Sequence, residues 1–428
     1  MKRKTVSFPV VDFQLTRLQL LSWASQFSSC SFLDNHQYAS LWNQQECLVA
    51  AGCYQYIKRP AGKALQQLQL FIDAHPGQWF FGHLAYDIKN EIEPLQSLHP
   101  DRIGFTDLHF FIPQIVVRLH EQHIIIDSFD DDHASVLLAI NTAKIESGSG
   151  VQTVQVKPRI TRDQYIGIVD KLRGHILRGD CYEVNFCQEF YARQAIIDPL
   201  EVYRKLSDVS PNPFSAFYRQ HDKYLLCASP ERYLMKRGDK LVSQPMKGTA
   251  SRKLNSGEQD ELQKNELREN PKERSENVMV VDLVRNDLSK VCEEATVQVD
   301  ELFGIYTYPQ VHQMISTISG QLRSDISFTD IIRATYPMGS MTGAPKKRVM
   351  EIIEQYEQTR RGLFSGAVGY ISPNGDFDFN VVIRSLLYNE TNKYLSYQVG
   401  GGITFYSDAG KEYDECLLKA EAIIAVLS

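Results

Sequence analysis

A predicted β-hairpin that carries an acid and an amine at one rim constrains the fold of this chain more than any other segment. An apolar run leads into Ser-Pro-Glu-Arg at residues 229–232, and a second run ends in Pro-Met-Lys-Gly-Thr at residues 245–249. The Arg-Gly-Asp turn at residues 237–239 separates them, which is typical of paired antiparallel strands. The hairpin therefore predicts that Glu231, at the start of one strand, and Lys247, past the end of the other, lie at the same rim.

The residues around Lys247 indicate that its backbone is fixed and its side chain has a defined direction. Pro245 fixes an extended backbone step, and Gly248 permits a turn directly after the lysine. Most lysines followed by glycine are solvated turn residues, because lysine is mostly exposed in folded proteins. An acid at the same rim favours the other interpretation, in which a lysine nucleophile works beside an acid–base group.

Length and composition exclude several classes of protein. The 428 residues suffice for two or three average domains or for one large α/β domain. No segment approaches the roughly 18 apolar residues of a membrane span, and no apolar region follows the basic N-terminus as in a signal peptide. The net charge of -6 without a long basic stripe excludes a nucleic-acid footprint. We expect a cytoplasmic protein whose eight cysteines, without a CxxC pair, are free thiols.

The chain has one candidate domain boundary. Glu-Ser-Gly-Ser-Gly at residues 146–150 has the composition of a flexible linker. We predict an N-terminal, strand-rich region over residues 1–150, a candidate regulatory part, and a catalytic domain over residues 151–428. Buried strands are expected at residues 79–87, 110–117 and 123–128, and a helix is expected to follow Thr161.

Two pairs of glutamates share one helical spacing. An Asn-Pro step at residues 270–271 predicts a helix start, so Glu273 and Glu276 lie on one face of that helix. Glu412 and Glu415 repeat the spacing near the C-terminus. One such pair is usually a solvated helix face. Since the chain has no His/Cys cluster with zinc spacing, carboxylate oxygens of this kind favour Mg²⁺.

Three further segments can bind anions. Ser-Met-Thr-Gly-Ala-Pro-Lys at residues 340–346 leads into a predicted helix whose free amides would face the preceding loop. The predicted strand at residues 378–384 ends in Arg384, and a planar guanidinium suits a carboxylate. Gly400 and Gly402 allow the backbone to approach a ligand.

These motifs, taken in order, resemble the chorismate-utilising enzymes. The resemblance runs from Thr161 to Ala425 and rests on five pieces: the segments at residues 229–232, 245–249, 276–287, 342–346 and 400–403. The alternation of strands and helices predicts an α/β (α+β) fold. The resemblance implies a layered sandwich of antiparallel sheets with flanking helices and the site between the sheets.

Lys247 is similar to the lysine of the aminodeoxychorismate synthases in this family, whereas anthranilate synthases usually carry alanine there. The resemblance implies a Mg²⁺-dependent transferase that aminates chorismate at C4, giving 4-amino-4-deoxychorismate for p-aminobenzoate and folate. Lys247 would attack C2, Glu231 would protonate the leaving C4 oxygen, and ammonia would enter at C4 and expel the lysine. Lys247 must be neutral to attack, so we expect desolvation beside Mg²⁺ to lower its pKa from about 10.4.

The resemblance also implies roles for other residues. Glu276 and Glu415 would touch Mg²⁺, and Glu273 and Glu412 would hold its waters. His312 would lie near the C4 oxygen. The substrate-binding residues would be Thr249, Thr342, Gly343, Arg384, Gly400, Gly402 and Lys419. The chain departs from the family at Glu183, where relatives often have glutamine, and at Phe364, where they carry tyrosine or tryptophan.

The source of ammonia is predicted to lie outside the chain. No cysteine occupies the glycine-flanked nucleophile turn of a glutaminase, so a separate glutamine amidotransferase subunit or free ammonia must supply the nitrogen. Many relatives hold tryptophan in the N-terminal region, but the sequence assigns no such pocket here, nor an oligomeric state or a docking face for the glutaminase.

Two rival functions stay open. An anthranilate synthase component I would add ammonia at C2 and expel pyruvate, and an isochorismate or salicylate synthase would add water. Lys247 argues against both, because it would occupy the space that the incoming C2 nucleophile needs. A non-catalytic chorismate-binding protein is the second rival, which the presence of Glu231, Lys247, Glu276 and Glu415 disfavours.

Overall fold

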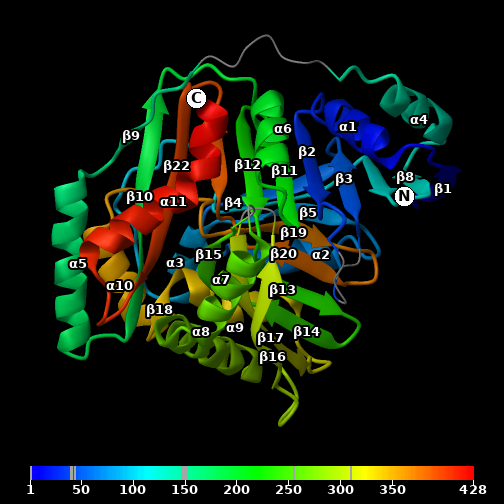
Figure 1. The fold of residues 1–428 in the computed structure, drawn as a ribbon. Coiled ribbons are helices and arrows are strands. Elements are labelled where there is room, and N and C mark those ends of the chain that lie inside the picture. Colours follow the sequence, from blue (N-terminus) through cyan, green and yellow to red (C-terminus); the bar gives the residue numbers. More distant parts are fainter. Residues whose placement is uncertain (1, 39–41, 43–44, 146–152, 254–255, 309–310) are drawn as a thin grey trace.

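Two large antiparallel sheets packed face to face form the body of the molecule (Figure 1). The computed structural model describes residues 2–38, 42, 45–145, 153–253, 256–308 and 311–428. The predicted layered sandwich of antiparallel sheets with flanking helices is confirmed.

The first sheet contains twelve strands among the described residues. In spatial order they are β1 (Lys4–Pro9), β8 (His123–Ser128), β7 (Ile115–Leu119), β3 (Cys47–Ala51), β2 (Ser29–Asp34), β11 (Phe214–Gln220), β12 (Lys223–Ser229), β21 (Ser385–Asn389), β22 (Tyr394–Ile403), β10 (Glu183–Arg193) and β18 (Gly343–Ala344), with β9 (Lys157–Pro158) paired to β10.

The second sheet contains ten strands among the described residues. Their order is β15 (Met246–Ser251), β17 (Val311–Gln321), β14 (Lys240–Gln244), β13 (Arg232–Arg237), β20 (Phe377–Asn380), β19 (Ala367–Ile371), β5 (Phe80–Leu84), β6 (Leu108–Ile112) and β4 (Gln55–Arg59), with β16 (Gln298–Thr307) paired to β17.

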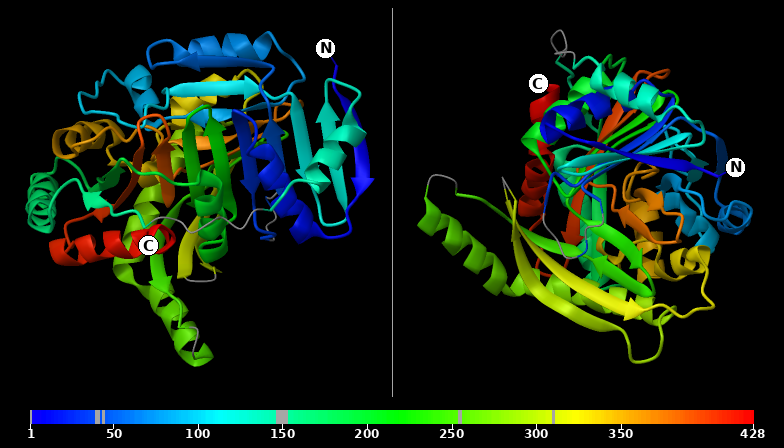
Figure 2. Two further views of the ribbon diagram at one scale, coloured as in Figure 1. Left: turned by 90° about the horizontal axis from the view of Figure 1, so that it is seen from above. Right: turned by 90° about the vertical axis from the view of Figure 1, so that its right-hand side faces the viewer.

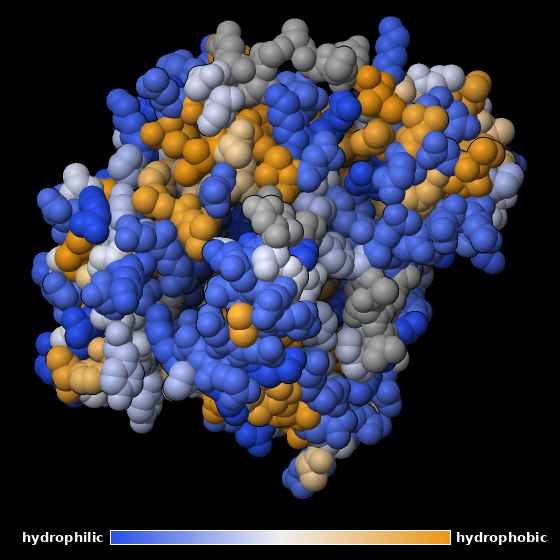
Figure 3. Space-filling model, in the orientation of Figure 1, coloured by the Kyte–Doolittle hydropathy of each residue, from blue (hydrophilic) through white to orange (hydrophobic). Residues whose placement is uncertain are grey.

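The α-helices cover the outer faces of the two sheets. They are α1 (Phe13–Ala24), α2 (Ala64–Asp73), α3 (Lys89–Ile92), α4 (His133–Asn141), α5 (Arg162–Leu177), α6 (Pro199–Val209), α7 (Gly257–Glu269), α8 (Pro271–Ser289), α9 (Phe328–Thr335), α10 (Lys346–Tyr356) and α11 (Ala409–Leu427). Figure 2 shows α7 projecting from the body of the molecule. The surface over α7 and α8 is mostly hydrophilic, whereas apolar side chains gather between α11 and α6 (Figure 3).

The strand before the hairpin, β12, is apolar over residues 224–228 because both of its faces are buried. In β12, Leu225 packs into the core between the sheets, and the next residue, Leu226, packs into the core under the helices. Successive side chains of a strand point to opposite faces, so a sheet buried on both faces needs apolar residues at consecutive positions.

The predicted hairpin is confirmed. Strands β13 and β14 pair antiparallel, and Arg237 lies opposite Lys240 across the turn. Glu231 lies directly before β13, and Lys247 is the second residue of β15. The chain leaves the first sheet at Ser229 and enters the second at Arg232, so Glu231 lies at the junction between the sheets.

Two predicted strands are wrong in the same way. The expected strand at residues 110–117 is divided at Pro113, because β6 belongs to the second sheet and β7 to the first. The expected strand at residues 378–384 ends with β20 at Asn380, and Arg384 has a φ of 49° just before β21 in the other sheet. Both crossings run through the core, so the apolar pattern continues where the strand does not.

The predicted helix starts are confirmed. Thr161 caps α5 through a capping box with Gln164, and the Asn270 side chain accepts hydrogen bonds from two backbone N–H groups of α8. Asp408 caps α11, the helix that contains Glu412 and Glu415. Each glutamate pair therefore lies in the first two turns of its helix, where the helix dipole stabilises negative charge.

The expected linker at residues 146–150 lies outside the described residues. Strands from both sides of it share both sheets, since β2 pairs with β11 and β5 pairs with β19. The division near residue 150 stays a prediction. All eight cysteines are free thiols, as expected. Across the described parts of the chain, no helix combines the length and the apolar character that crossing a membrane requires.

Truncation of Leu225 tests the core between the sheets. The side chain is fully buried, so Leu225→Ala should lower the free energy of unfolding by about 2–5 kcal/mol. Leu138→Ala on α4, where the side chain is 64% exposed, should change it by less than about 0.5 kcal/mol. Urea unfolding measures both variants, and equal effects would show that Leu225 does not support the core.

Candidate active site

A pocket of about 830 Å³, part of it open to solvent, lies between the end of β22, the hairpin and the helices α8 and α11. This size is typical of sites for small molecules. Its lining consists of Asn185, Glu231, Met246, Lys247, Gly248, Thr249, Lys272, Glu273, Glu276, Ser340, Met341, Phe364, Ile383, Arg384, Gln398, Val399, Gly400, Gly401, Gly402, Glu412, Glu415 and Lys419.

The structure brings most of the predicted site residues into this one pocket. Those that line it are Glu231, Lys247, Thr249, Glu273, Glu276, Arg384, Gly400, Gly402, Glu412, Glu415 and Lys419. They come from segments that span the chain from residue 231 to residue 419. Three predicted residues, His312, Thr342 and Gly343, are not part of the lining.

His312 lies in β17, and its ring is buried away from the pocket. Its Nε2 lies 3.1 Å from a carboxylate oxygen of Asp260 in α7, and its Nδ1 lies 3.0 Å from the hydroxyl of Thr307. The ring therefore joins α7 to the sheet in this structure.

The Ser-Met-Thr-Gly loop contributes residues other than the expected ones. The hydroxyl of Thr342 donates to the carbonyl oxygen of Met338 at 3.0 Å, so it is engaged within the loop. Gly343 has a φ of 141° and packs against the backbone of Glu183, where a side chain would overlap it. Ser340 and Met341 form the side of the loop that faces the pocket.

Glu231 is a buried carboxyl group at the junction between the sheets. Its Oε1 accepts a hydrogen bond from the hydroxyl of Ser340 at 2.6 Å. Burial raises the pKa of Glu231 to about 7, and the bond from Ser340 and the charge of Lys247 oppose this only in part. A carboxyl group that titrates near neutrality can donate and accept a proton at physiological pH.

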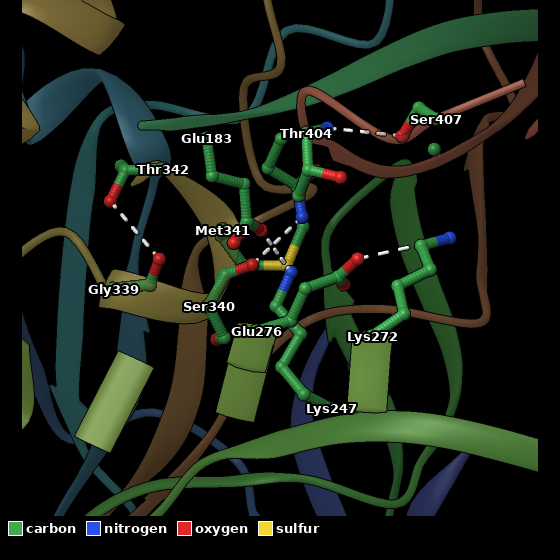
Figure 4. A network of polar contacts seen from close by, with 12 residues as sticks. Glu183, Lys247, Lys272, Glu276, Gly339, Ser340, Met341, Thr342, Thr404 and Ser407 are labelled. Carbon is green, nitrogen blue, oxygen red and sulfur yellow. Dashed lines mark hydrogen bonds and ion pairs between the residues drawn. The ribbon is translucent and has the colours of Figure 1, made fainter. Parts of the chain in front are cut away.

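Lys247 forms an ion pair with Glu183, the first residue of β10 (Figure 4). Burial lowers the pKa of Lys247, but the carboxylates of Glu183 and Glu276 outweigh burial and hold the pKa above its ordinary value. The expected lowering of this pKa beside Mg²⁺ stays a prediction, because Glu276 is one of the carboxylates whose charge the ion would offset. Lys247 is an ammonium cation that needs a proton acceptor before it can attack.

The four predicted metal ligands come from two helices that both line the pocket. Glu273 and Glu276 come from α8, and Glu412 and Glu415 come from α11. Lys272 Nζ lies 3.1 Å from Oε1 of Glu412 and 3.8 Å from Oε1 of Glu276 (Figure 4). The described residues contain no group of three or more His, Cys, Asp or Glu side chains close enough together to hold a metal ion.

The donor chemistry of this cluster nevertheless fits a hard divalent cation. Glu276 Oε1 is buried without a hydrogen-bond partner among the described residues, and burial raises the pKa of Glu276 to about 8. A carboxyl group in this state gains from a nearby positive charge. Oxygen ligands of this kind suit Mg²⁺.

The groups expected to bind an anion line the same pocket, and one of them, Lys419, pairs with Oε1 of Glu415 at 2.7 Å. Burial lowers the pKa of Arg384 to about 10, which still leaves the guanidinium charged at neutral pH. Gly400 lies against the backbone of Phe186, where a side chain would overlap it, and Gly402 faces Lys247 and Glu183. Lys419 Nζ donates to the carbonyl oxygen of Gly400 at 3.0 Å.

Several polar residues in and beside the pocket, among them Ser340, Lys272 and Glu183, have no role in the sequence-based prediction. Ser340 lies in a motif that the sequence singles out, and Lys272 lies beside Glu273, so local sequence points to their neighbourhood. Glu183 is 64 residues from Lys247 in the chain, and only the sheet pairing brings it to the lysine.

Comparison with known proteins identifies the family. Residues 34–425 match the family of chorismate binding enzymes, and the chain belongs to this family. The chain is 35% identical over 353 residues to aminodeoxychorismate synthase component 1 of Klebsiella aerogenes, covering 80% of this chain and 76% of that protein. It is also 35% identical over 356 residues to an anthranilate synthase component I-like protein of Synechocystis, covering 82% and 73%.

A solved structure shares the fold. Anthranilate synthase component I from Streptococcus pneumoniae superposes with a TM-score of 0.79 at 25% identity, covering 91% of this chain and 94% of that chain. The likeness extends over both sheets and is not confined to the motifs.

The titration of Glu231 is directly measurable. Difference infrared spectra between the wild type and Glu231→Gln should show the carbonyl band of a protonated carboxyl group below neutral pH. The band should lose half its intensity near pH 7, because burial raises this pKa from 4.5 to about 7. A midpoint near 4.5 would contradict the burial argument.

Proposed function

We propose that this chain aminates chorismate at C4 to give 4-amino-4-deoxychorismate, on the way to p-aminobenzoate and folate. The observation that carries the proposal is the position of Lys247, which lines the pocket together with Glu231. The name of the Klebsiella relative supports the same reaction.

The reaction must replace a poor leaving group, the C4 hydroxyl of chorismate, by an amine. In the proposed first stage Lys247 bonds to C2, the ring double bonds shift, and Glu231 gives its proton to the departing C4 oxygen. In the second stage ammonia bonds to C4, the double bonds shift back and the bond between C2 and Lys247 breaks. The carboxylate of Glu231 is then available to take a proton from the new ammonium group.

The two carboxylates of chorismate are assigned to different groups of the pocket lining. Arg384, Thr249 and the backbone amides near Gly400 and Gly402 would bind the enolpyruvyl carboxylate. Glu276 and Glu415 would hold Mg²⁺, with Glu273 and Glu412 orienting its waters, and when bound the ion supplies positive charge against the ring carboxylate. Lys419 adds a cation on the same side.

The proposal includes a partner. The word component in the relatives' names supports a second subunit, a glutamine amidotransferase that releases ammonia, and free ammonium would serve in its place. We propose that both work in the cytoplasm. No role in the reaction is proposed for His312, Thr342 or Gly343, which lie outside the pocket.

The name of the Synechocystis relative raises the rival of amination at C2. Lys247 opposes it, because the lysine stands where a C2 nucleophile has to enter. A non-catalytic binding protein would not need a lysine and an acid that both face the ligand.

Product analysis tests the proposal. Purified protein with chorismate, Mg²⁺ and ammonium should yield p-aminobenzoate only when a lyase that removes pyruvate is added, as seen by chromatography with mass detection. Anthranilate as the product would establish the C2 rival, and chorismate binding without any product would establish the binding protein.

Two substitutions then test the assigned roles. Lys247→Ala should abolish C4 amination or redirect it to C2, and Glu231→Gln should lower kcat by about 10²–10⁴-fold, because the departing oxygen loses its proton donor. Lys240→Ala, in the same hairpin but outside the pocket, is the matched control and should leave kcat unchanged. Unchanged C4 amination in Lys247→Ala would remove the covalent scheme.

A further inference from the structure

Glu183 is a buried carboxylate that the reaction described above does not use. Its side chain is 2% exposed and does not line the pocket. One oxygen, Oε1, accepts from Lys247 Nζ, and the other, Oε2, is buried without a hydrogen-bond partner among the described residues (Figure 4). A carboxylate so far from water is costly unless it is paired, so its pairing with the nucleophile calls for a physical reason.

A glycine in the neighbouring strand leaves room for the ion pair between Glu183 and Lys247. In the pairing of β10 with β22, Gly402 lies opposite Asn185, two residues beyond Glu183. A side chain at Gly402 would overlap Glu183 Oε1 and lie 2.7 Å from Lys247 Nζ. The glycine thus keeps the carboxylate and the ammonium group in contact at the back of the pocket.

Lys247 has to lose a proton before Nζ has a free electron pair. The charged groups that face it are Glu183 from β10, Glu273 and Glu276 from α8, Glu415 and Lys419 from α11, and Glu231 directly before β13. Within 4.0 Å, and among the described residues, Lys247 forms an ion pair with Glu183 alone. Glu231 is already engaged with Ser340 and serves as the proton donor.

Proton transfer inside the pair has a favourable consequence. When one proton moves from Nζ to Oε1, two buried charges become two neutral groups, and the net charge of the site does not change. Burial disfavours charged forms, so the low-polarity surroundings reduce the cost of this transfer. Transfer to solvent would instead leave the Glu183 carboxylate buried without its partner.

We infer that Glu183 is a positioning residue for Lys247 and also its proton acceptor. It holds the ammonium group in the resting protein and takes one proton as Nζ bonds to C2. An N–H bond breaks, an O–H bond forms at Glu183, and the freed electron pair of Nζ makes the bond to carbon. When the lysine is expelled, the proton returns from Glu183 to Nζ. This inference rests on the proposed attack by Lys247.

Glu183→Gln tests the inference, because it keeps the shape of the side chain and removes the proton acceptor. Activity with chorismate, Mg²⁺ and ammonium is compared with wild type at each pH, and in this ratio the titration of free ammonia cancels. The variant should keep the KM for chorismate within about twofold and lose at least about tenfold in kcat near pH 7. The deficit should shrink by about tenfold per pH unit toward pH 9, because the lysine must now lose its proton to solvent.

Two further variants separate proton transfer from a structural effect. Glu183→Asp keeps a carboxylate and should retain the pH profile of the wild type at a lower level. Glu189→Gln removes a carboxylate from the same strand, one that pairs with Arg159 outside the pocket, and should leave kcat and its pH profile unchanged. Circular dichroism and calorimetric chorismate binding check the fold of each variant.

A deficit of equal size at every pH, or no deficit, would overturn the inference. If Glu183→Gln does not fold, the pH profile of kcat for Glu183→Asp decides. A kcat deficit of this variant that shrinks as pH rises would contradict the inference, because the variant still has a carboxylate that can accept the proton. A wild-type protein without product would instead contradict the proposed function, so the two failures are distinguishable.

Discussion

The site depends on the points where the chain crosses from one sheet to the other. Glu231 lies between β12 of the first sheet and β13 of the second, and Arg384 lies between β20 of the second and β21 of the first. A crossing interrupts the ladder of hydrogen bonds and frees polar groups in an interior that is otherwise apolar. Buried polar groups need partners, and at these crossings a ligand with charged groups can supply them.

The charges of the pocket explain how a chain with a net negative charge can bind a dianion. Five glutamates line the pocket against three lysines and one arginine: Glu231, Glu273, Glu276, Glu412 and Glu415 against Lys247, Lys272, Lys419 and Arg384. The lining thus has one more carboxyl group than it has cations, and burial raises the pKa of Glu231 and of Glu276 because it disfavours their charged forms. A dianion adds to that excess, so binding requires a proton on one carboxyl group, a cation, or both.

The features of this structure that the sequence predicts are set by local patterns of residues. The turn after Arg237, the caps at Thr161 and Asn270 and the glutamate spacings are properties of a few neighbouring residues, and all occur where expected. Sheet crossings are not local, because an apolar run looks the same whether it stays in one sheet or passes into the next. Two predicted strands fail for this reason.

The parts of the site that the sequence does not predict depend on contacts between distant segments. A lone histidine and a hydroxyl in a glycine-rich loop give no sign of the direction in which they point, and both His312 and Thr342 face protein partners. The pair of Glu183 with Lys247 depends on the placement of β10 beside β22 and of the hairpin opposite them. No spacing in the sequence encodes that distance.

A single buried guanidinium contacts both the segment that positions the acid, Glu231, and the strand that positions the partner of Lys247. Arg361 pairs with Glu357 at 2.7 Å and donates to the carbonyl oxygens of Met341 at 2.6 Å and Asn185 at 2.8 Å. Met341 follows the serine that bonds to Glu231, and Asn185 lies two residues after Glu183 in β10. Because one side chain holds both backbone segments, the partner of the acid and the partner of the nucleophile keep a fixed relation. Rigid placement of this kind lets two groups from different sheets act on one ligand.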